Sequence, residues 1–381
     1  MGRPVCDFPW RYAFVSTSGR LSHCCSVVPR TEISGVTSFD EYWNSDYMKH
    51  VRSLFLAGKY LEAGCPATCP TLLAQFPSLS SHINVRGQYD SAARTGSNYL
   101  DSLPASVFDP PATKDENKRL IKKEVAEDFC EVKSRPMRAH IEINSACNLK
   151  CQMCDVGVGE SSRTNPRFFI DDQNLEKMKV FYPNLEYIEI QGGEVFFYTV
   201  DKAPLTKLLK DLSENAPKDV QVLITTNALA LNERWVDFLL DRDIVSHLSV
   251  SIDTVDPDAY ERQRLGGRLS VVLKNLDYLT EQKAKRRREK PGIVFTSVLN
   301  SITYPNLLAL QDLAARHGAS SVWFHFMAPT GSPEFIKETQ IFVASRKPDL
   351  VALRGLLERF EYPSNRKTVL GAIDQLLAQA A

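Results

Sequence analysis

The sequence has no excess of charge of either sign and no long hydrophobic run. Its 381 residues include 46 Lys and Arg and 46 Asp and Glu, so the formal net charge is zero. This balance argues against a strong bulk attraction to nucleic acid or to an anionic membrane. The opening residues, MGRPVCDFPWRY, lack the apolar core of a signal peptide, and no stretch approaches membrane-spanning length. We therefore expect a cytoplasmic protein with no membrane segment and no nucleic-acid partner.

Cysteine is missing from the whole chain after Cys154, although the chain contains nine cysteines. Five lie before residue 70, one stands alone at Cys130, and three lie together in CNLKCQMC, residues 147–154. In a reducing compartment these residues are expected to be thiols rather than disulfides. Such clustering favours metal ligation over core packing.

The chain divides into three predicted regions: a cysteine-rich domain at 1–70, a linker and helix at 71–135, and a core with C-terminal covering helices at 136–381. The first region contains a predicted helix at 38–58, in which Ser38 and Glu41 are placed as a capping box. The second ends in a charged amphipathic helix at 114–129.

Six β-branched or aromatic runs in the third region predict strands. They are residues 138–145, 186–191, 220–227, 247–253, 292–300 and 321–327. Their alternation with helical sequence predicts the α/β class, as a parallel sheet curled into a partial (β/α)6 TIM-like barrel. The working residues of such barrels lie at the C-terminal ends of the strands. The cysteine triplet and the stretches GGE, TTN and SID all lie at such ends.

The triplet has the spacing C-x3-C-x2-C, with no fourth cysteine nearby. A cubane iron–sulfur cluster has four irons, and three thiolates leave one iron open to a ligand from outside the protein. A catalytic zinc keeps one position open in the same way. Two other interpretations stay open at this point: a zinc site completed by His140 or Asp155, and three cysteines that only fill the core.

At these residues the sequence resembles the radical S-adenosylmethionine (SAM) superfamily. The resemblance implies that Cys147, Cys151 and Cys154 hold a [4Fe–4S] cluster whose open iron binds the amine and carboxylate of SAM. Reductive cleavage of SAM would give a 5′-deoxyadenosyl radical that abstracts hydrogen from a substrate. The resemblance also implies an electron donor such as flavodoxin or ferredoxin. Met153 occupies a position that is usually aromatic in the family and lies close to the adenine.

Two further stretches resemble the family by position. Gly192, Gly193 and Glu194 match a motif that receives the SAM amine, with glycines for close approach to a ligand and a carboxylate that accepts from an ammonium. Val195 stands where a proline often follows. Asn227 lies in a stretch that resembles the family's TNG, with alanine in place of the glycine.

Three residues, in the fourth predicted strand and after it, complete the expected SAM contacts. Ser251 and Asp253 resemble an S-x-D segment that reaches the ribose or the carboxylate of SAM. Arg264 lies where relatives often carry an arginine in the following helix. It is expected either to contact the SAM carboxylate or to be a plain surface charge.

The N-terminal cysteines resemble a second kind of iron–sulfur domain. Cys6 and Cys24 flank a predicted β-hairpin with the spacing C-x12-G-x4-C, and Cys65 and Cys69 follow the predicted helix. The order resembles a SPASM domain, and more closely its shortened twitch form, which binds one auxiliary [4Fe–4S] cluster. Cys25 is an alternative ligand in place of Cys24. A structural zinc ion is the alternative occupant of the site. Cys130 is left over and is expected to be a buried thiol.

The sequence thus predicts a radical SAM enzyme with an N-terminal auxiliary cluster. A peptide or protein side chain is the first choice of substrate, by analogy with relatives that carry auxiliary clusters. A sugar, a nucleotide or another small metabolite is the alternative. An interpretation of another class is a non-catalytic iron–sulfur or zinc protein that carries electrons or acts as a scaffold.

Overall fold

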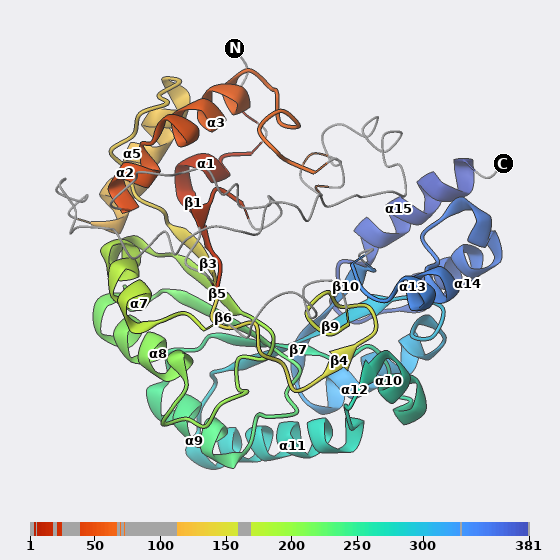
Figure 1. Cartoon of the computed structure of the whole chain (residues 1–381). Coiled ribbons are helices and arrows are strands. Elements are labelled where there is room, and N and C mark those ends of the chain that lie inside the picture. Colours follow the sequence, from red (N-terminus) through yellow and green to blue (C-terminus); the bar gives the residue numbers. More distant parts are fainter. Residues whose placement is uncertain are drawn as a thin grey trace. The chain divides into compact units, whose positions relative to one another are not determined.

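The computed structural model describes residues 4, 6–17, 21–24, 39–66, 69, 72, 113–158, 169–327 and 330–379 (Figure 1). Its strands form a mostly parallel eight-stranded sheet in the order β10-β9-β7-β6-β5-β3-β1-β2. Their bounds are β1 (Tyr12–Val15), β2 (Leu21–Ser22), β3 (Arg138–Glu142), β5 (Tyr187–Gln191), β6 (Gln221–Thr226), β7 (His247–Ser251), β9 (Gly292–Leu299) and β10 (Ala319–Phe326). Two short strands, β4 (Lys150–Cys151) and β8 (Arg264–Leu265), form a separate antiparallel pair.

All six predicted strands are present, as β3, β5, β6, β7, β9 and β10, and helices follow them in the chain. The predicted α/β class with a partial-barrel strand order is therefore confirmed. The sheet also gains a strand from the first region, because β1 pairs in parallel with β3, with Tyr12 opposite Arg138 and Val15 opposite Ile141. The predicted N-terminal hairpin is present as the antiparallel pair of β1 and β2, although its Gly19 lies outside the described residues.

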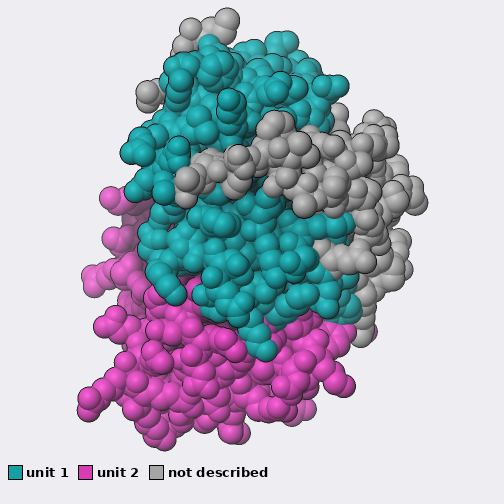
Figure 2. Space-filling model, turned by 90° about the vertical axis from the view of Figure 1, so that its left-hand side faces the viewer, with its two compact units in different colours: residues 1–143, 169–190, 207–221 teal, residues 144–168, 191–206, 222–381 magenta. Residues whose placement is uncertain are grey.

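The chain divides into two compact units (Figure 2). Unit 1 consists of residues 1–143, 169–190 and 207–221, and unit 2 of residues 144–168, 191–206 and 222–381. The predicted boundaries at residues 70 and 135 stay a prediction, and the linker between residues 73 and 112 lies outside the described residues.

Unit 1 contains the N-terminal helices. The helices of unit 1 are α1 (Phe8–Arg11), α2 (Phe39–Trp43), α3 (Asp46–Leu56), α5 (Lys114–Ala126), α7 (Asp172–Met178), the 3-10 helix η4 (Lys179–Asn184) and most of α8 (Pro204–Asn215). The predicted helix at 114–129 is α5, which begins at the N-cap residue Thr113. The single helix predicted at 38–58 is wrong, because the chain forms α2 and then α3. Ser45 is the N-cap of α3, and the predicted cap residue Ser38 lies outside the described residues.

The helix breaks at Asn44 because this side chain bonds the backbone of a distant residue. Its amide donates to the carbonyl of Val132 at 2.7 Å and accepts the Val132 N–H at 2.8 Å. The buried indoles of Trp10 and Trp43 donate to the carbonyls of Phe129 and Ser134. The segment after α5, predicted to be part of a linker, is therefore bonded to the N-terminal helices of unit 1.

Unit 2 carries β7, β9, β10 and most of β6. Its helices are α9 (Glu233–Arg242), α10 (Pro257–Gln263), α11 (Leu269–Arg286), η5 (Tyr304–Asn306), α12 (Leu307–Arg316), α13 (Pro333–Thr339), η6 (Ala344–Arg346), α14 (Lys347–Arg359) and α15 (Arg366–Gln379). Residues along β9 alternate between buried and partly exposed, as expected of a sheet with one face against helices. No helix in the described ranges is both long and apolar enough to cross a membrane.

The chain segment between α14 and α15 lies along the edge strand β10. Asn365, just before α15, exchanges two hydrogen bonds with the backbone of Phe324, at 2.8 and 2.9 Å. The Val322 N–H donates to the carbonyl of Pro363 at 2.9 Å. These bonds satisfy backbone groups that an open sheet edge leaves unpaired.

Candidate functional site

The three cysteines of the triplet belong to, or pack against, one buried apolar cluster of unit 2. Cys147 follows β3 in the chain, Cys151 lies in β4, and Cys154 lies in the turn after it. Cys151 packs in a buried cluster, and Cys147 and Cys154 pack against that cluster. The other buried members are Leu149, Met153, Met327 and Phe335. The sequence prediction placed Met153 beside a ligand, and the structure places it among these apolar side chains.

Burial favours the neutral form of the Cys147 and Cys151 thiols. Burial raises the pKa of Cys147 to about 12, with smaller contributions from Glu194 and from the other two cysteines. Burial also raises the pKa of Cys151 to about 11, against the influence of Arg264. A soft metal centre that takes thiolates would therefore have to displace protons on binding. Among the described residues, no three His, Cys, Asp or Glu side chains converge on a single ion.

Backbone contacts from two directions fix the cysteine loop. The β4–β8 pair sets Cys151 opposite Arg264 and Lys150 opposite Leu265, and the Gln152 N–H donates to the carbonyl of Gln263 at 2.8 Å. On the other side, the Ser332 N–H donates to the carbonyl of Gln152 at 2.8 Å. The loop is thus held by segments more than 100 residues further along the chain.

Two glycines that the sequence prediction missed complete this support. A Cβ on Gly157 would lie 2.6 Å from the backbone nitrogen of Cys151, and a Cβ on Gly331 would lie 2.3 Å from the carbonyl oxygen of Gln152. Only residues without a side chain fit at such distances. The pattern C-x3-C-x2-C-x2-G already contains Gly157, whereas Gly331 carries no local signal.

Gly192 and Gly193 pack closely against the backbone before Cys147. A Cβ on Gly192 would lie 2.4 Å from the carbonyl oxygen of Asn144, and one on Gly193 would lie 2.3 Å from that of Ala146. The N–H groups of Gly193 and Glu194 donate to the same two carbonyls, each at 2.8 Å. The glycines let this loop pack against the segment that leads into Cys147.

Glu194 is a buried hydrogen-bond acceptor, with 1% of its surface exposed. Its Oε1 accepts from the Thr226 hydroxyl at 2.6 Å and from the Phe196 N–H at 3.1 Å, and its Oε2 accepts from the Asn227 N–H at 2.8 Å. Burial raises the pKa of Glu194, although these hydrogen bonds oppose the shift. Oε2 keeps an acceptor position, but the carboxylate mainly joins the GGE and TTN motifs.

Asn227 links the TTN motif to the cysteine loop. Its Nδ2 donates to Asn148 Oδ1 at 2.8 Å and lies 3.9 Å from Cys147 Sγ. Its Oδ1 accepts the Leu229 N–H at 2.9 Å. Ala228 has a φ of 57°, the left-handed conformation that glycine adopts most easily. The left-handed backbone explains why the family that this sequence resembles has glycine at this position. Alanine adopts the same conformation with some strain.

Asp253 and Arg264 form a buried ion pair. Arg264 Nε lies 2.5 Å from Asp253 Oδ2, and Asp253 Oδ1 accepts the Val298 N–H at 2.8 Å. Arg264 is 7% exposed and begins β8 directly after α10. The expectation of a plain surface charge in a helix is therefore wrong. Burial lowers the pKa of Arg264, but the Asp253 carboxylate and Cys151 more than offset it and hold this pKa above its usual range.

Ser251 lies in a row of side chains that crosses three strands on one face of the sheet. The register sets Ser251 of β7 beside Thr296 of β9, and Thr296 beside Trp323 of β10. Ser251 is partly exposed, and Trp323 is 49% exposed. The sequence prediction missed Trp323 because an aromatic residue in a strand normally indicates core.

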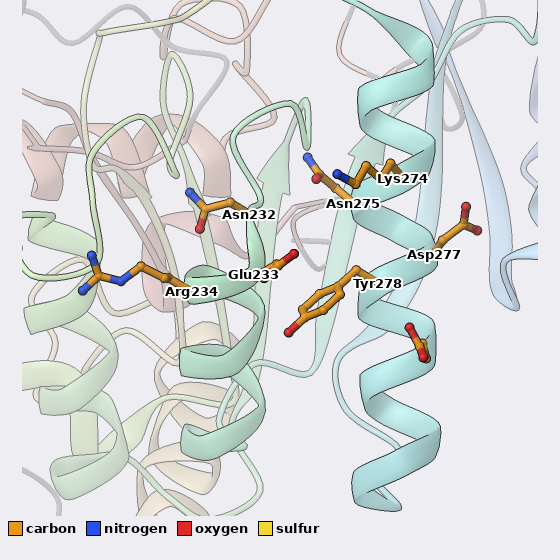
Figure 3. A pocket seen from close by; sticks show the side chains of 8 residues that line it. Asn232, Glu233, Arg234, Lys274, Asn275, Asp277 and Tyr278 are labelled. Atoms are coloured by element: carbon orange, nitrogen blue, oxygen red, sulfur yellow. The ribbon is translucent and has the colours of Figure 1, made fainter.

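A separate groove lies between α9 and α11 (Figure 3). Its volume is about 490 Å³, and mostly charged or polar side chains line it: Asn232, Glu233, Arg234, Lys274, Asn275, Asp277, Tyr278 and Glu281. None of them is a predicted site residue. Asn275 instead supports the TTN loop, since it donates to the carbonyl of Ala228 at 2.9 Å.

The N-terminal cysteines form a second group in unit 1. Burial raises the pKa of Cys6 to about 11 and that of Cys65 to about 12, and Cys69 contributes to both shifts. The influence of Cys69 on both pKa values indicates that these three thiols lie near one another, with Cys6 before α1 in the chain and Cys65 and Cys69 after α3. Cys24 follows β2, and Cys25 lies outside the described residues. No disulfide joins any of the described cysteines.

Residues 141–299 match the radical SAM superfamily. Curated relatives include a probable GTP 3′,8-cyclase of Methanococcus maripaludis, 29% identical over 37% of this chain and 44% of the relative. The GTP 3′,8-cyclase of Alkaliphilus metalliredigens is 28% identical over 36% and 41%. The FeMo cofactor biosynthesis protein NifB of Rhizobium leguminosarum is 30% identical over 32% and 25%. The chain thus spans less than half the length of these relatives.

Among solved structures, Streptococcus suis SuiB bound to S-adenosylmethionine is similar, with 17% identity and a TM-score of 0.48. The similarity covers 66% of this chain and 55% of SuiB.

Proposed function

Because residues 141–299 match the radical SAM superfamily, we propose that the chain is an enzyme that cleaves SAM reductively and abstracts hydrogen from a small molecule. The observation that carries the proposal is the packing of Cys147, Cys151 and Cys154 at one buried apolar cluster. A [4Fe–4S] cluster bound there would supply the electron that breaks the carbon–sulfur bond of SAM. A donor such as flavodoxin or ferredoxin would supply that electron in turn.

The three cysteine ligands fit a [4Fe–4S] cluster. Three soft thiolates suit iron–sulfur chemistry, and three rather than four leave one iron open to SAM. Cys151 and Met153 are buried among apolar side chains, whereas Cys147 and Cys154 are partly exposed. The Cys147 and Cys151 thiols, whose pKa values are raised, would lose their protons as the metal binds, so loading should improve with rising pH.

We propose two groups among the predicted SAM contacts. Met153 and Ser251 would contact the adenine and the ribose, and the backbone at Gly192 and Gly193 would lie beside the methionyl end. Glu194, Asn227, Asp253 and Arg264 would act mainly as a frame, because their side chains already bond within unit 2. Glu194 would still accept from the SAM amine through the remaining position on Oε2.

A small metabolite is the substrate class that we propose in place of a peptide. The named activities of the curated relatives are GTP cyclisation and the biosynthesis of a metal cofactor. The row of Ser251, Thr296 and Trp323 supports the same choice, since it offers hydroxyls beside an exposed ring. Such a row suits a molecule with a flat ring and several polar groups.

We also propose that Cys6, Cys24, Cys65 and Cys69 hold an auxiliary [4Fe–4S] cluster. The mutual influence of Cys6, Cys65 and Cys69 on their pKa values supports a shared site. A zinc ion is the alternative occupant, because four thiolates are also a zinc ligand set.

The enzyme proposal is tested by anaerobic reconstitution with iron and sulfide, followed by dithionite and SAM. Formation of 5′-deoxyadenosine, lost in Cys151→Ala and kept in Cys130→Ala, is the expected result. Cys130 is the matched control because it is a cysteine outside both groups. A reconstituted protein that holds the cluster but never cleaves SAM would instead be an electron carrier or a scaffold.

A further inference from the structure

Arg264 and Cys151 lie opposite each other across the antiparallel pair of β4 and β8. The guanidinium Nη1 of Arg264 lies 3.8 Å from Cys151 Sγ. Arg264 is 7% exposed, and Cys151 is also 7% exposed. An arginine side chain stays charged at any working pH. Cys151 therefore has a permanent positive charge beside it, in surroundings that screen charge poorly.

Asp253 holds this charge in place. Its Oδ2 accepts from Arg264 Nε at 2.5 Å, and its Oδ1 accepts the Val298 N–H of β9 at 2.8 Å. Asp253 is 2% exposed, so strand β9 fixes the carboxylate and the carboxylate fixes the guanidinium. The Nε side of the guanidinium faces Asp253, and Nη1 faces the sulfur. The positive end of the ion pair is thus the end nearer to Cys151.

We infer that Arg264 is a positioning residue that favours the reduced form of a cluster bound at Cys151. The inference rests on the proposed function. Reduction adds one electron from a low-potential donor and neither gains nor loses an atom, so the site becomes more negative by one charge. A fixed positive charge beside a ligand sulfur stabilises the more negative form more strongly. Arg264 therefore raises the reduction potential of the site.

This role differs from the one that the sequence prediction considered, a direct contact with the SAM carboxylate. The two roles predict different losses when the charge is removed. If Arg264 contacts SAM, removal of its charge would weaken SAM binding and leave the potential of the SAM-free cluster unchanged. A charge beside Cys151 shifts that potential before SAM is added.

The test is a redox titration of the reconstituted holoprotein without SAM, followed by electron paramagnetic resonance of the reduced cluster. We expect Arg264→Gln to shift the midpoint potential to a more negative value and Asp253→Asn to shift it to a more positive value. Arg262→Gln is the matched control, because Arg262 is 53% exposed and pairs with Glu338. Its midpoint should equal that of the unmodified protein.

Arg264→Gln leaves Asp253 buried without its partner, which can prevent folding. The double variant Arg264→Gln with Asp253→Asn removes both charges and keeps an amide pair in their place. Its midpoint should still be more negative than that of the unmodified protein, because the nearer charge is lost.

Equal midpoints in the unmodified protein and the double variant would overturn the inference, as would equal midpoints in the two single variants. Weakened SAM binding with an unchanged midpoint would assign Arg264 to SAM instead. If the unmodified protein takes up no reducible cluster, the proposed function itself is wrong, and the inference is wrong with it.

Discussion

The carboxylate of Glu194 accepts the backbone N–H of Asn227 at 2.8 Å, across 33 residues of sequence. This bond joins the GGE and TTN motifs, which the sequence prediction treated as separate ligand contacts. Because Asn227 in turn lies 3.9 Å from Cys147 Sγ, Glu194 also sets the position of a group beside the cysteines. The motif residues therefore support one another before any ligand binds.

Glu194→Gln should destabilise the protein by about 1–3 kcal/mol, because the NH2 that replaces one carboxylate oxygen cannot accept from the buried donors that meet that oxygen. Urea unfolding followed by circular dichroism measures the change. Glu338→Gln is the matched control, because Glu338 forms an exposed pair with Arg262 that should be worth less than about 1 kcal/mol. Equal losses of unfolding free energy in both variants would show that the buried hydrogen bonds of Glu194 stabilise the protein no more than an exposed ion pair does.

Gly331→Ala should displace the cysteine loop and lower the iron content of the reconstituted protein. The new Cβ would lie 2.3 Å from the carbonyl oxygen of Gln152, and relief of such overlap costs about 1–3 kcal/mol. Gly355→Ala in α14 is the control, since nothing lies within 4 Å of its Cβ. It should stabilise the helix by about 0.5–1 kcal/mol. Iron assays and thermal unfolding of both variants check these expectations.

The sequence predicts the six core strands and the grouping of the cysteines because both signals are local. Runs of β-branched residues indicate strands wherever they occur, and the triplet spacing fits in eight residues. The contacts that position the site are not local. Gly331 meets the cysteine loop from 179 residues away in the chain, and Arg264 meets Cys151 across 113 residues. No pattern within a short window contains such contacts.

The break between α2 and α3 could not be predicted from the sequence either, because it also depends on a contact between distant residues. Residues 38–58 have helical periodicity throughout, and propensity alone favours one helix. The two bonds between Asn44 and the backbone of Val132, 88 residues away, decide otherwise. Tertiary hydrogen bonds of this kind outweigh a propensity difference of a few tenths of a kcal/mol.

His317 should make the protein less stable as the pH falls. Its side chain is buried at the end of α12, and burial, with a contribution from Arg316, lowers its pKa below the ordinary value of 6.5, although Asp277 opposes the shift. A lowered pKa means that the unfolded chain takes up a proton that the folded chain does not. Stability from the neutral form is therefore complete above about pH 6.5 and is lost below it.

His317→Gln removes this titration, so its free energy of unfolding should fall less steeply than that of the unmodified protein between about pH 6.5 and pH 5. Urea unfolding at several pH values measures both slopes. Parallel slopes would mean that His317 takes up its proton equally well in the folded and unfolded states.

Cys65→Ala should remove about four of about eight irons per chain after reconstitution, whereas Cys151→Ala should remove the other four. The two losses are expected to be independent because the cysteines lie in different compact units. Cys130→Ala should keep all of the iron.

Counts of iron, sulfide and zinc separate the alternatives for the N-terminal site. A protein that holds about four irons and one zinc, and loses the zinc in Cys65→Ala, has a structural zinc site there. Loss of all iron in Cys65→Ala would instead mean that folding around the N-terminal cysteines is needed before the triplet can load.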